Sequence, residues 1–515
     1  MSLFKVGGTF PPTGGNNEHK KRINRYRENK KLFKGFHYDV FHRRRDHLSV
    51  NQSHLLYISA NLPALICKKS ADFLFGEPAT FDAGVEENSS EQRAFERFES
   101  QNDMNILNYE SSLGNAYRGD SFYKISWGQR WEGRVGEDLD PFRMFIEPQN
   151  AEYVFPETLP GDAKNIFVYH IAYPVEVPYS KKQEYILEVE SHYPGHIVER
   201  QFRMRPNTRD RDGTVLEFNI YAEIKESRDT TDTDVPYPLV VHVPNYALED
   251  SWEGLDDLSE HHSLFDEINM RLSLIAEILD KHSDPAMSVP PGSLGEDESG
   301  QPIFHAGRDK IFEQDQGEPE PKYITWDGHL NAAFKELDYL LDYLLMTAEI
   351  PPVVLGKDNS GTSGSSGSGI KQRMNSLLLK IKRKRQYYEK GLKRVLVIAQ
   401  MVEESRGKAD YTLVEDPRVL FNERLADDEM EKATVAQIRS GGKPTKSQKS
   451  ILMEDYKLTE EQADREIDRI QEEEKRDGFV DSSVFNKEIN ADLDDLDEEE
   501  DELDDGLEEG EGADA

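Results

Sequence analysis

The segment 326–405 constrains the fold most, because it places a loose loop between two long helical patterns. The first pattern begins near Asp327, a residue type that caps helix N-termini, and its apolar residues recur at helical spacing as far as Ala348. Pro351 and Pro352 then end the helix, because proline lacks an amide proton and clashes with the preceding turn.

The loop and the helix after it have opposite compositions. Residues 356–369 are almost all Gly, Ser, Thr, Asn and Asp, so we expect a mobile loop with little to bury. The next pattern is a basic helix over 370–405, whose apolar stripe extends for about 50 Å at 1.5 Å per residue. Such a stripe packs either on the chain's own β domain or against identical subunits, and a ring is one closed arrangement of subunits. The lengths of the helices favour packing between subunits.

Charge argues against a simple nucleic-acid-binding protein. The chain of 515 residues has 36% hydrophobic and 32% charged residues, enough for more than one domain, and a formal net charge of −37. Residues 491–515 contain 15 Asp or Glu and no Lys or Arg, which predicts a disordered acidic tail.

The single cysteine and the absence of long apolar stretches indicate the setting. Cys67 lies in an apolar helical run, so we expect a packed thiol, no intrachain disulfide and a reducing compartment. No stretch reaches 18 apolar residues, and the N-terminus lacks a signal-peptide pattern, so neither a membrane span nor a signal peptide is expected.

The fold class expected is α+β. Helical patterns cover 18–34, 54–76, 88–118 and a long stretch that opens at Trp252 and ends at Asp284-Pro285. Short alternating runs between turns predict an antiparallel meander. These runs are Ser121–Trp127, Arg143–Ile146, Ile166–Ile171, Tyr185–Val189, Ile197–Met204, Val215–Ile224 and Leu239–Val243.

The remaining segments are shorter. Residues 285–326 are rich in Pro and Gly and predict a small inserted subdomain, with strand candidates at Pro302–His305 and Tyr323–Trp326. Tyr411–Val414 suggests a returning strand, and 427–475 predicts three short helices with capping-box spacings.

Enzyme signatures are absent. The loop 364–369 resembles a phosphate-binding loop, but Ile370 intervenes before Lys371 and Gln372 stands where Ser or Thr is needed. The adjacent His261 and His262 point apart on a helix and predict a solvated pair rather than a metal site. We therefore predict no catalytic residue, no cofactor and no metal site.

Basic clusters have two interpretations each. The helix over 18–34 presents either a solvated face or a contact with capsid or nucleic acid, and the first is favoured. The basic residues of the long helix either pair with acidic residues of neighbouring helices, the favoured interpretation, or face DNA near its first turn. These residues are Lys371, Arg373, Lys380, Lys382, Arg383, Lys384 and Arg385.

Two short motifs resemble the portal proteins of long-tailed, siphovirus-type bacteriophages. Residues 61–78 look like the family's helix that ends in a Leu-Phe-Gly-Glu-Pro turn, and 349–356 looks like the junction between its stem helix and tunnel loop. The order of elements from about residue 20 to residue 475 also matches. The order and spacing of these motifs, rather than any one of them, carry the resemblance.

The resemblance implies a portal architecture: a wing over 1–250, stem helices over 251–284 and 328–350, a clip over 285–327, a tunnel loop over 351–370, a long helix with a returning wing strand over 371–424, a helical crown over 425–478 and the acidic tail over 479–515. It implies DNA-facing tunnel residues Lys357, Asp358, Asn359, Thr362, Lys371 and Arg373. It implies clip interface residues Glu296, Asp297, Arg308, Lys310 and Glu313.

The resemblance also implies a function without catalysis. Portal proteins form a ring, commonly a dodecamer, at one capsid vertex of the virion, after assembly in the bacterial cytoplasm. The ring conducts double-stranded DNA during packaging and ejection, and its partners are the large terminase subunit, a head-completion or adaptor protein, and the major capsid and scaffolding proteins. No membrane and no cofactor are implied. Two alternatives stay open: a nucleic-acid-processing enzyme or motor subunit, and a non-viral oligomeric scaffold.

Overall fold

The computed structural model describes residues 3–13, 18–41, 57–86, 88–131, 133–178, 183–209, 213–283, 287–288, 295–296, 302–303, 322–323, 330–356, 367–422, 447–454 and 463–471. The chain divides into two compact units, one formed by 1–363 with 369–425 and the other by 364–368 with 426–515. In the second unit, the described residues form α11 (Gln448–Glu454) and a helical run over 463–471. Two of the three helices predicted over 427–475 are thus present, while the first predicted helix and the acidic tail lie outside the described residues.

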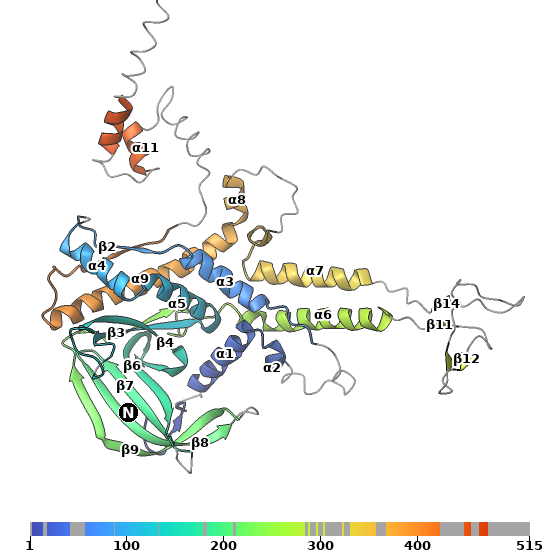
Figure 1. Cartoon of the computed structure of the whole chain (residues 1–515), viewed down its shortest axis with the longest axis horizontal. Helices are drawn as coiled ribbons and strands as arrows, with labels where there is room; N and C mark the ends of the chain where they lie inside the picture. The colour runs from blue at the N-terminus through green and yellow to red at the C-terminus, as the bar shows by residue number, and fades with distance from the viewer. Residues whose placement is uncertain are drawn as a thin grey trace, which may run out of the picture. The chain divides into compact units, whose positions relative to one another are not determined.

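The largest sheet is the predicted meander (Figure 1). Its six antiparallel strands lie in the order β1-β9-β8-β7-β6-β5. They are β1 (Thr9–Phe10), β5 (Val154–Leu159), β6 (Asp162–Glu176), β7 (Tyr185–Tyr193), β8 (His196–Arg209) and β9 (Val215–Asp232). A two-residue turn joins β7 to β8, and Gly195 there has a φ of 86°, a left-handed conformation that glycine adopts without strain.

A second, three-stranded sheet supports the long helix. Its order is β10-β3-β4, formed by β10 (Val240–Pro244), β3 (Asp120–Gly128) and β4 (Arg143–Gln149). Helix α9 (Asn375–Ser405) packs its apolar stripe on this sheet, with Leu392, Val395 and Ile398 in one core with Val243 and Ile125. The stripe of α9 is therefore covered by the chain's own β domain, and the expectation that it packs between subunits is wrong.

Glycine allows α9 to lie this close to the sheet. A Cβ atom at Gly391 would overlap Cγ2 of Val243 on β10. The α9 backbone consequently approaches β10 more closely than any larger residue at this position permits.

Several predicted helix bounds are wrong for local reasons. The helix predicted over 54–76 is α3 (Leu62–Phe75), which begins after Asn61 caps the amide of Ala64. The helix predicted over 88–118 is two helices, α4 (Ser90–Gln101) and α5 (Met104–Arg118), because Asp103 adopts a left-handed conformation with a φ of 47°. The helix predicted over 370–405 is interrupted at Met374, which separates α8 (Gly367–Arg373) from α9.

The N-terminal helix is not the solvated basic face that was favoured. In α1 (Glu18–Phe33), which precedes α2 (His37–Phe41), Arg22 is buried and donates from Nη2 to the carbonyl oxygen of Val154 at 2.9 Å. Its Nη1 donates to the carbonyl oxygen of Ala151 at 3.1 Å, so the guanidinium joins α1 to the start of β5. As predicted, Cys67 is a packed thiol, and burial raises its pKa.

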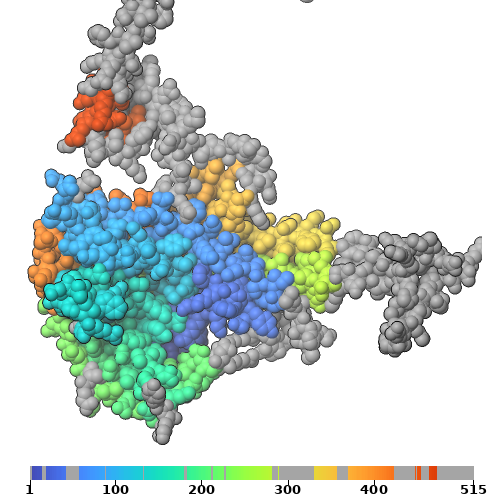
Figure 2. All heavy atoms as spheres, in the orientation of Figure 1, coloured from blue at the N-terminus to red at the C-terminus, as the bar shows by residue number. Residues whose placement is uncertain are grey.

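Two antiparallel helices form an arm, defined here as α6 (His262–Ser283) and α7 (Leu330–Thr347), which lie side by side (Figure 1). The helix predicted from Trp252 begins ten residues later, because 252–258 forms a turn followed by the short 3-10 helix η4 (Ser259–His261). The carboxylate of Asp256 stabilises that turn by accepting from the amides of Leu258 and Ser259. Figure 2 shows both helices, yellow-green and yellow, at the molecular surface.

Short strands complete the first unit. The strand predicted at 411–414 is absent; β15 (Arg418–Leu420) pairs instead with β2 (Thr80–Asp82). In the predicted insertion, β11 (Met287–Ser288) pairs with β14 (Lys322–Tyr323), and β12 (Gly295–Glu296) pairs with β13 (Pro302–Ile303). Among the described residues, no helix has the length and apolar character needed to cross a membrane.

Candidate functional site

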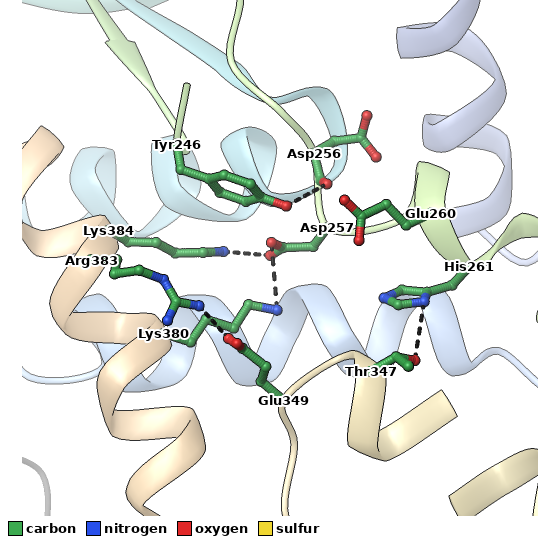
Figure 3. Close-up of a pocket in the computed structure, with 10 residues that line it drawn as sticks. All are labelled: Tyr246, Asp256, Asp257, Glu260, His261, Thr347, Glu349, Lys380, Arg383 and Lys384. Carbon is green, nitrogen blue, oxygen red and sulfur yellow. Dashed lines mark hydrogen bonds and ion pairs between the residues drawn. The ribbon is translucent and has the colours of Figure 1, made fainter. Parts of the chain in front are cut away.

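The arm joins the rest of its unit at a charged cavity of about 230 Å³ (Figure 3). The turn that leads into α6, the end of α7 and the first turns of α9 each contribute side chains. We call the lining residues the charged junction: Tyr246, Asp256, Asp257, Glu260, His261, Thr347, Glu349, Lys380, Arg383 and Lys384.

Asp257 is the centre of this junction. It is buried and pairs with the ammonium of Lys384, while the Lys380 Nζ lies 3.5 Å from its Oδ1. Asn245 Nδ2 donates to the carboxylate at 3.1 Å, and Ser70 Oγ of α3 donates at 3.0 Å. One carboxylate therefore connects the turn before α6 with α3 and α9.

Burial and charge act in opposite directions on these groups. Burial alone raises the pKa of the Asp257 carboxyl, but the charges of Lys380 and Lys384 outweigh it and hold the pKa well below its ordinary value. Burial lowers the pKa of the Lys384 ammonium to about 8, although the charge of Asp257 opposes this shift. Both groups are charged at neutral pH, and each depends on its partner for that.

Two contacts hold the end of α7 against α9. Lys380 Nζ donates at 3.1 Å to the carbonyl oxygen of Ala348, which follows the last turn of α7 and carries the negative end of the helix dipole. Arg383 pairs with Glu349, whose φ of 59° reverses the chain before Pro351. The ends of both arm helices are thus joined to α9.

The two adjacent histidines are buried, so the prediction of a solvated pair is wrong. His262 Nε2 lies 2.7 Å from Asn29 Oδ1 of α1, and His261 Nδ1 lies 3.4 Å from Thr347 Oγ1 at the end of α7. Burial lowers the pKa of His261. The two rings point to different helices and add a polar contact on each side of η4.

The chemistry of the junction is structural. Its lysines and the Asp257 carboxylate are engaged with each other, so none of them is available as a nucleophile or general base. Within the described ranges, no group of three or more His, Cys, Asp or Glu side chains is arranged to hold a metal ion. The site instead fixes the base of the arm relative to α9 and α3.

Sequence reasoning predicted part of this arrangement. Lys380, Arg383 and Lys384 pair with acidic residues, as the favoured interpretation held, but the partners lie in connecting turns rather than on neighbouring helices. Asp257 was missed, although Lys380 and Lys384 lie one turn apart on the apolar side of α9, which is a signal for a buried partner.

The predicted site residues are only partly described. Lys371 and Arg373 lie on α8, where Arg373 is exposed and Lys371 is half-buried. Glu296 is the second residue of β12. The other predicted residues lie outside the described ranges: Lys357, Asp358, Asn359, Thr362, Asp297, Arg308, Lys310 and Glu313.

Comparison with known proteins gives a family match over most of the chain. Residues 16–478 match the family model described as phage portal protein, SPP1 Gp6-like. No curated protein matches the chain.

Similar solved structures come from gene transfer agent (GTA) particles. A chain of the virion of the native particle is 12% identical, with a TM-score of 0.41, and the match covers 76% of this chain and 89% of that one. A chain of the neck of the empty particle, computed with C6 symmetry, is 11% identical with a TM-score of 0.41 and coverages of 78% and 92%. A chain of the neck of the native particle, computed with C12 symmetry, is 11% identical with a TM-score of 0.41 and coverages of 76% and 88%.

Proposed function

Because the chain belongs to the SPP1 Gp6-like family of phage portal proteins, we propose that its copies close into a ring through which double-stranded DNA passes. As a portal protein it is a component of the virion, part of the head–tail connector at the capsid vertex, and it is not an enzyme. Family membership thus decides against both alternatives left open by the sequence, the nucleic-acid-processing enzyme and the non-viral scaffold.

The observation that most supports a ring is the uncovered side of α7. Tyr339, Tyr343 and Met346 are 74%, 54% and 67% exposed. At 100° per residue they lie on the side of α7 opposite Leu337 and Leu344, which are buried. A helix that is apolar on two sides is typically covered on two sides. A neighbouring copy of the arm would supply the second cover.

Helix α6 offers a matching surface for that contact. Met270, Leu274 and Ile278 recur at helical spacing and are only half-buried in the single chain. We propose that α7 of one copy packs against this side of α6 of the next. Because the two surfaces differ, the contact is heterologous and closes into a ring when the rotation between copies is a whole fraction of a turn.

The parts of the portal map onto the structure as follows in this proposal. The wing spans 1–250, the stem helices are α6 and α7 within 251–284 and 328–350, and the clip spans 285–327. The tunnel loop spans 351–370, the long helix with the returning strand spans 371–424, the crown spans 425–478, and the acidic tail spans 479–515. The charged junction then holds the stem against the wing, which supports a fixed channel diameter.

Named residues take roles in the same proposal. The DNA-facing tunnel residues are Lys357, Asp358, Asn359, Thr362, Lys371 and Arg373. The clip interface residues are Glu296, Asp297, Arg308, Lys310 and Glu313. The clip would contact the large terminase subunit during packaging and a head-completion or adaptor protein afterwards, and the wing would contact capsid and scaffolding proteins. We propose twelve copies per ring.

Shortening the tunnel loop tests this function. Deleting most of 358–368 removes Gly- and Ser-rich chain without touching the arm or the charged junction, so rings should form in normal yield. The DNA content of particles assembled with this variant should fall, as measured by nuclease-protected DNA per particle. Normal DNA packaging in that variant would contradict the tunnel-loop assignment.

A further inference from the structure

The exposed face of α9 is basic, in contrast to the rest of this acidic chain. Between residues 375 and 394 the exposed side chains of α9 include no carboxylate. They are Asn375, Ser376, Leu379, Lys382, Arg383, Gln386, Lys390 and Arg394. We call the four cations among them, Lys382, Arg383, Lys390 and Arg394, the α9 basic face. The chain as a whole carries a net charge of −37, so this face differs in sign from its surroundings.

Two of these four cations are engaged and two are not. Arg383 pairs with Glu349, and the guanidinium of Arg394 lies 3.7 Å from the ring centre of Tyr237. Lys382 and Lys390 make no ion pair or hydrogen bond with any residue that the structure describes. The adjoining carboxylates, Glu389 and Asp416, pair with Lys393 rather than with these two lysines.

The spacing of the two unengaged lysines suits a linear polyanion. They are eight residues apart on a regular helix, which places them about 12 Å apart along its axis. One strand of duplex DNA carries a phosphate every 3.4 Å of helix axis, so this distance spans three to four phosphates. Point charges on flexible stems can follow such a backbone without reading the bases.

The face also continues a surface already assigned to DNA. It follows directly from α8, whose Lys371 and Arg373 are proposed to face the channel. We propose that the α9 basic face contacts the phosphodiester backbone of duplex DNA and extends the DNA contact of the tunnel loop along the long helix. This inference rests on the proposed function, which brings duplex DNA to this helix.

The small number of unengaged cations sets the character of the contact. Two lysines release few counterions, so the contact is weak and depends on salt concentration. Because phosphates repeat along the duplex, each lysine can move from one phosphate to the next. A contact of this kind guides DNA while allowing it to slide.

A salt titration with a DNA probe tests the inference. A fluorescein-labelled 30-base-pair duplex of arbitrary sequence is titrated with the full-length protein at several sodium chloride concentrations. The logarithm of the binding constant is then plotted against the logarithm of salt concentration. Lys382→Ala/Lys390→Ala should reduce the magnitude of the slope by about 1.8, which is two contacts at about 0.9 each.

Two further variants act as controls. Lys382→Arg/Lys390→Arg keeps both charges and should keep the original slope. Lys5→Ala/Lys21→Ala removes two exposed lysines elsewhere in the same unit and should leave the slope unchanged. Electron microscopy of each variant records ring formation separately, so failure of the proposed function is seen independently of DNA affinity.

Two results would overturn the inference. An unchanged slope for Lys382→Ala/Lys390→Ala, with rings intact, would show that DNA does not contact this face. Loss of rings with an unchanged slope would show that the face contacts a neighbouring copy instead. An equal loss of slope in the Lys5→Ala/Lys21→Ala control would mean that net charge, rather than this face, attracts the DNA.

Discussion

Replacing Asp257 by Asn should loosen the base of the arm more than any other isosteric change in the charged junction. Asn keeps the shape of the side chain but removes the one negative charge that Lys380 and Lys384 share. Lys384 is almost fully buried at 2% exposure, so its ammonium would lose its only ion-pair partner among the described residues. Breaking a buried pair from one side costs about 3–5 kcal/mol, and we expect Asp257→Asn to fall in that range.

Hydrogen exchange measured by mass spectrometry locates the effect. Peptides from the first turns of α9 and from the turn before α6 should exchange faster in Asp257→Asn than in the wild-type chain. Peptides from the meander should not change, because they belong to a separate core. Adding Lys384→Met to Asp257→Asn should restore part of the lost protection, since it removes the unpaired buried charge.

The pH dependence gives a second test of the same site. The pKa of Lys384 in the folded chain, about 8, is below the ordinary lysine value of 10.5. Its charged form is therefore penalised in the folded state, and that penalty is complete below pH 8 and fades as the pH rises to 10.5. Protection of α9 should rise over this window in the wild-type chain relative to Lys384→Met. Protection in Asp257→Asn within 0.5 kcal/mol of wild type, taken as about the size of an ordinary surface change, would refute this account of the junction.

Three further changes have defined outcomes. Gly391→Ala should lower the free energy of unfolding by about 1–3 kcal/mol, because its Cβ overlaps Val243, and Val243→Ala should recover part of the loss in a denaturant titration. Tyr339→Glu/Tyr343→Glu should reduce the fraction of ring in mass photometry without changing helix content by circular dichroism, because both side chains are exposed in the single chain. Deleting 481–515 should leave ring formation unchanged in the same assay.

Matched variants separate these effects from general damage. Ser100→Glu/Asn105→Glu adds the same two charges at exposed positions away from the arm and should leave the ring fraction unchanged. Equal stability of Gly391→Ala and wild type would show that α9 does not approach β10 as closely as described. Loss of rings on deletion of 481–515 would assign the tail a role in assembly that its composition does not predict.

The sheets were predictable because their signal is local. All seven predicted strands before residue 244 are present, since each alternates between a buried and an exposed side and is bounded by turn residues. Strand β5 was missed because its buried residues, Val154, Phe155 and Pro156, are contiguous and do not alternate. A run of this kind has no period-two signal.

Helix ends and the charged junction were not predictable from local pattern. The break between α4 and α5 depends on one left-handed residue, Asp103, and the late start of α6 depends on Asp256 accepting from two backbone amides. The junction joins Ser70, Asp257 and Lys384, which are far apart in the sequence, so only the tertiary fold brings them together.

The central claim is that copies of this chain form a closed ring around a channel. Negative-stain electron microscopy of the purified protein, with native mass spectrometry in parallel, tests it most directly. We predict rings with a central hole and, for twelve copies of 59.1 kDa, a mass of about 709 kDa. A monodisperse monomer or dimer at every concentration measured would contradict the claim.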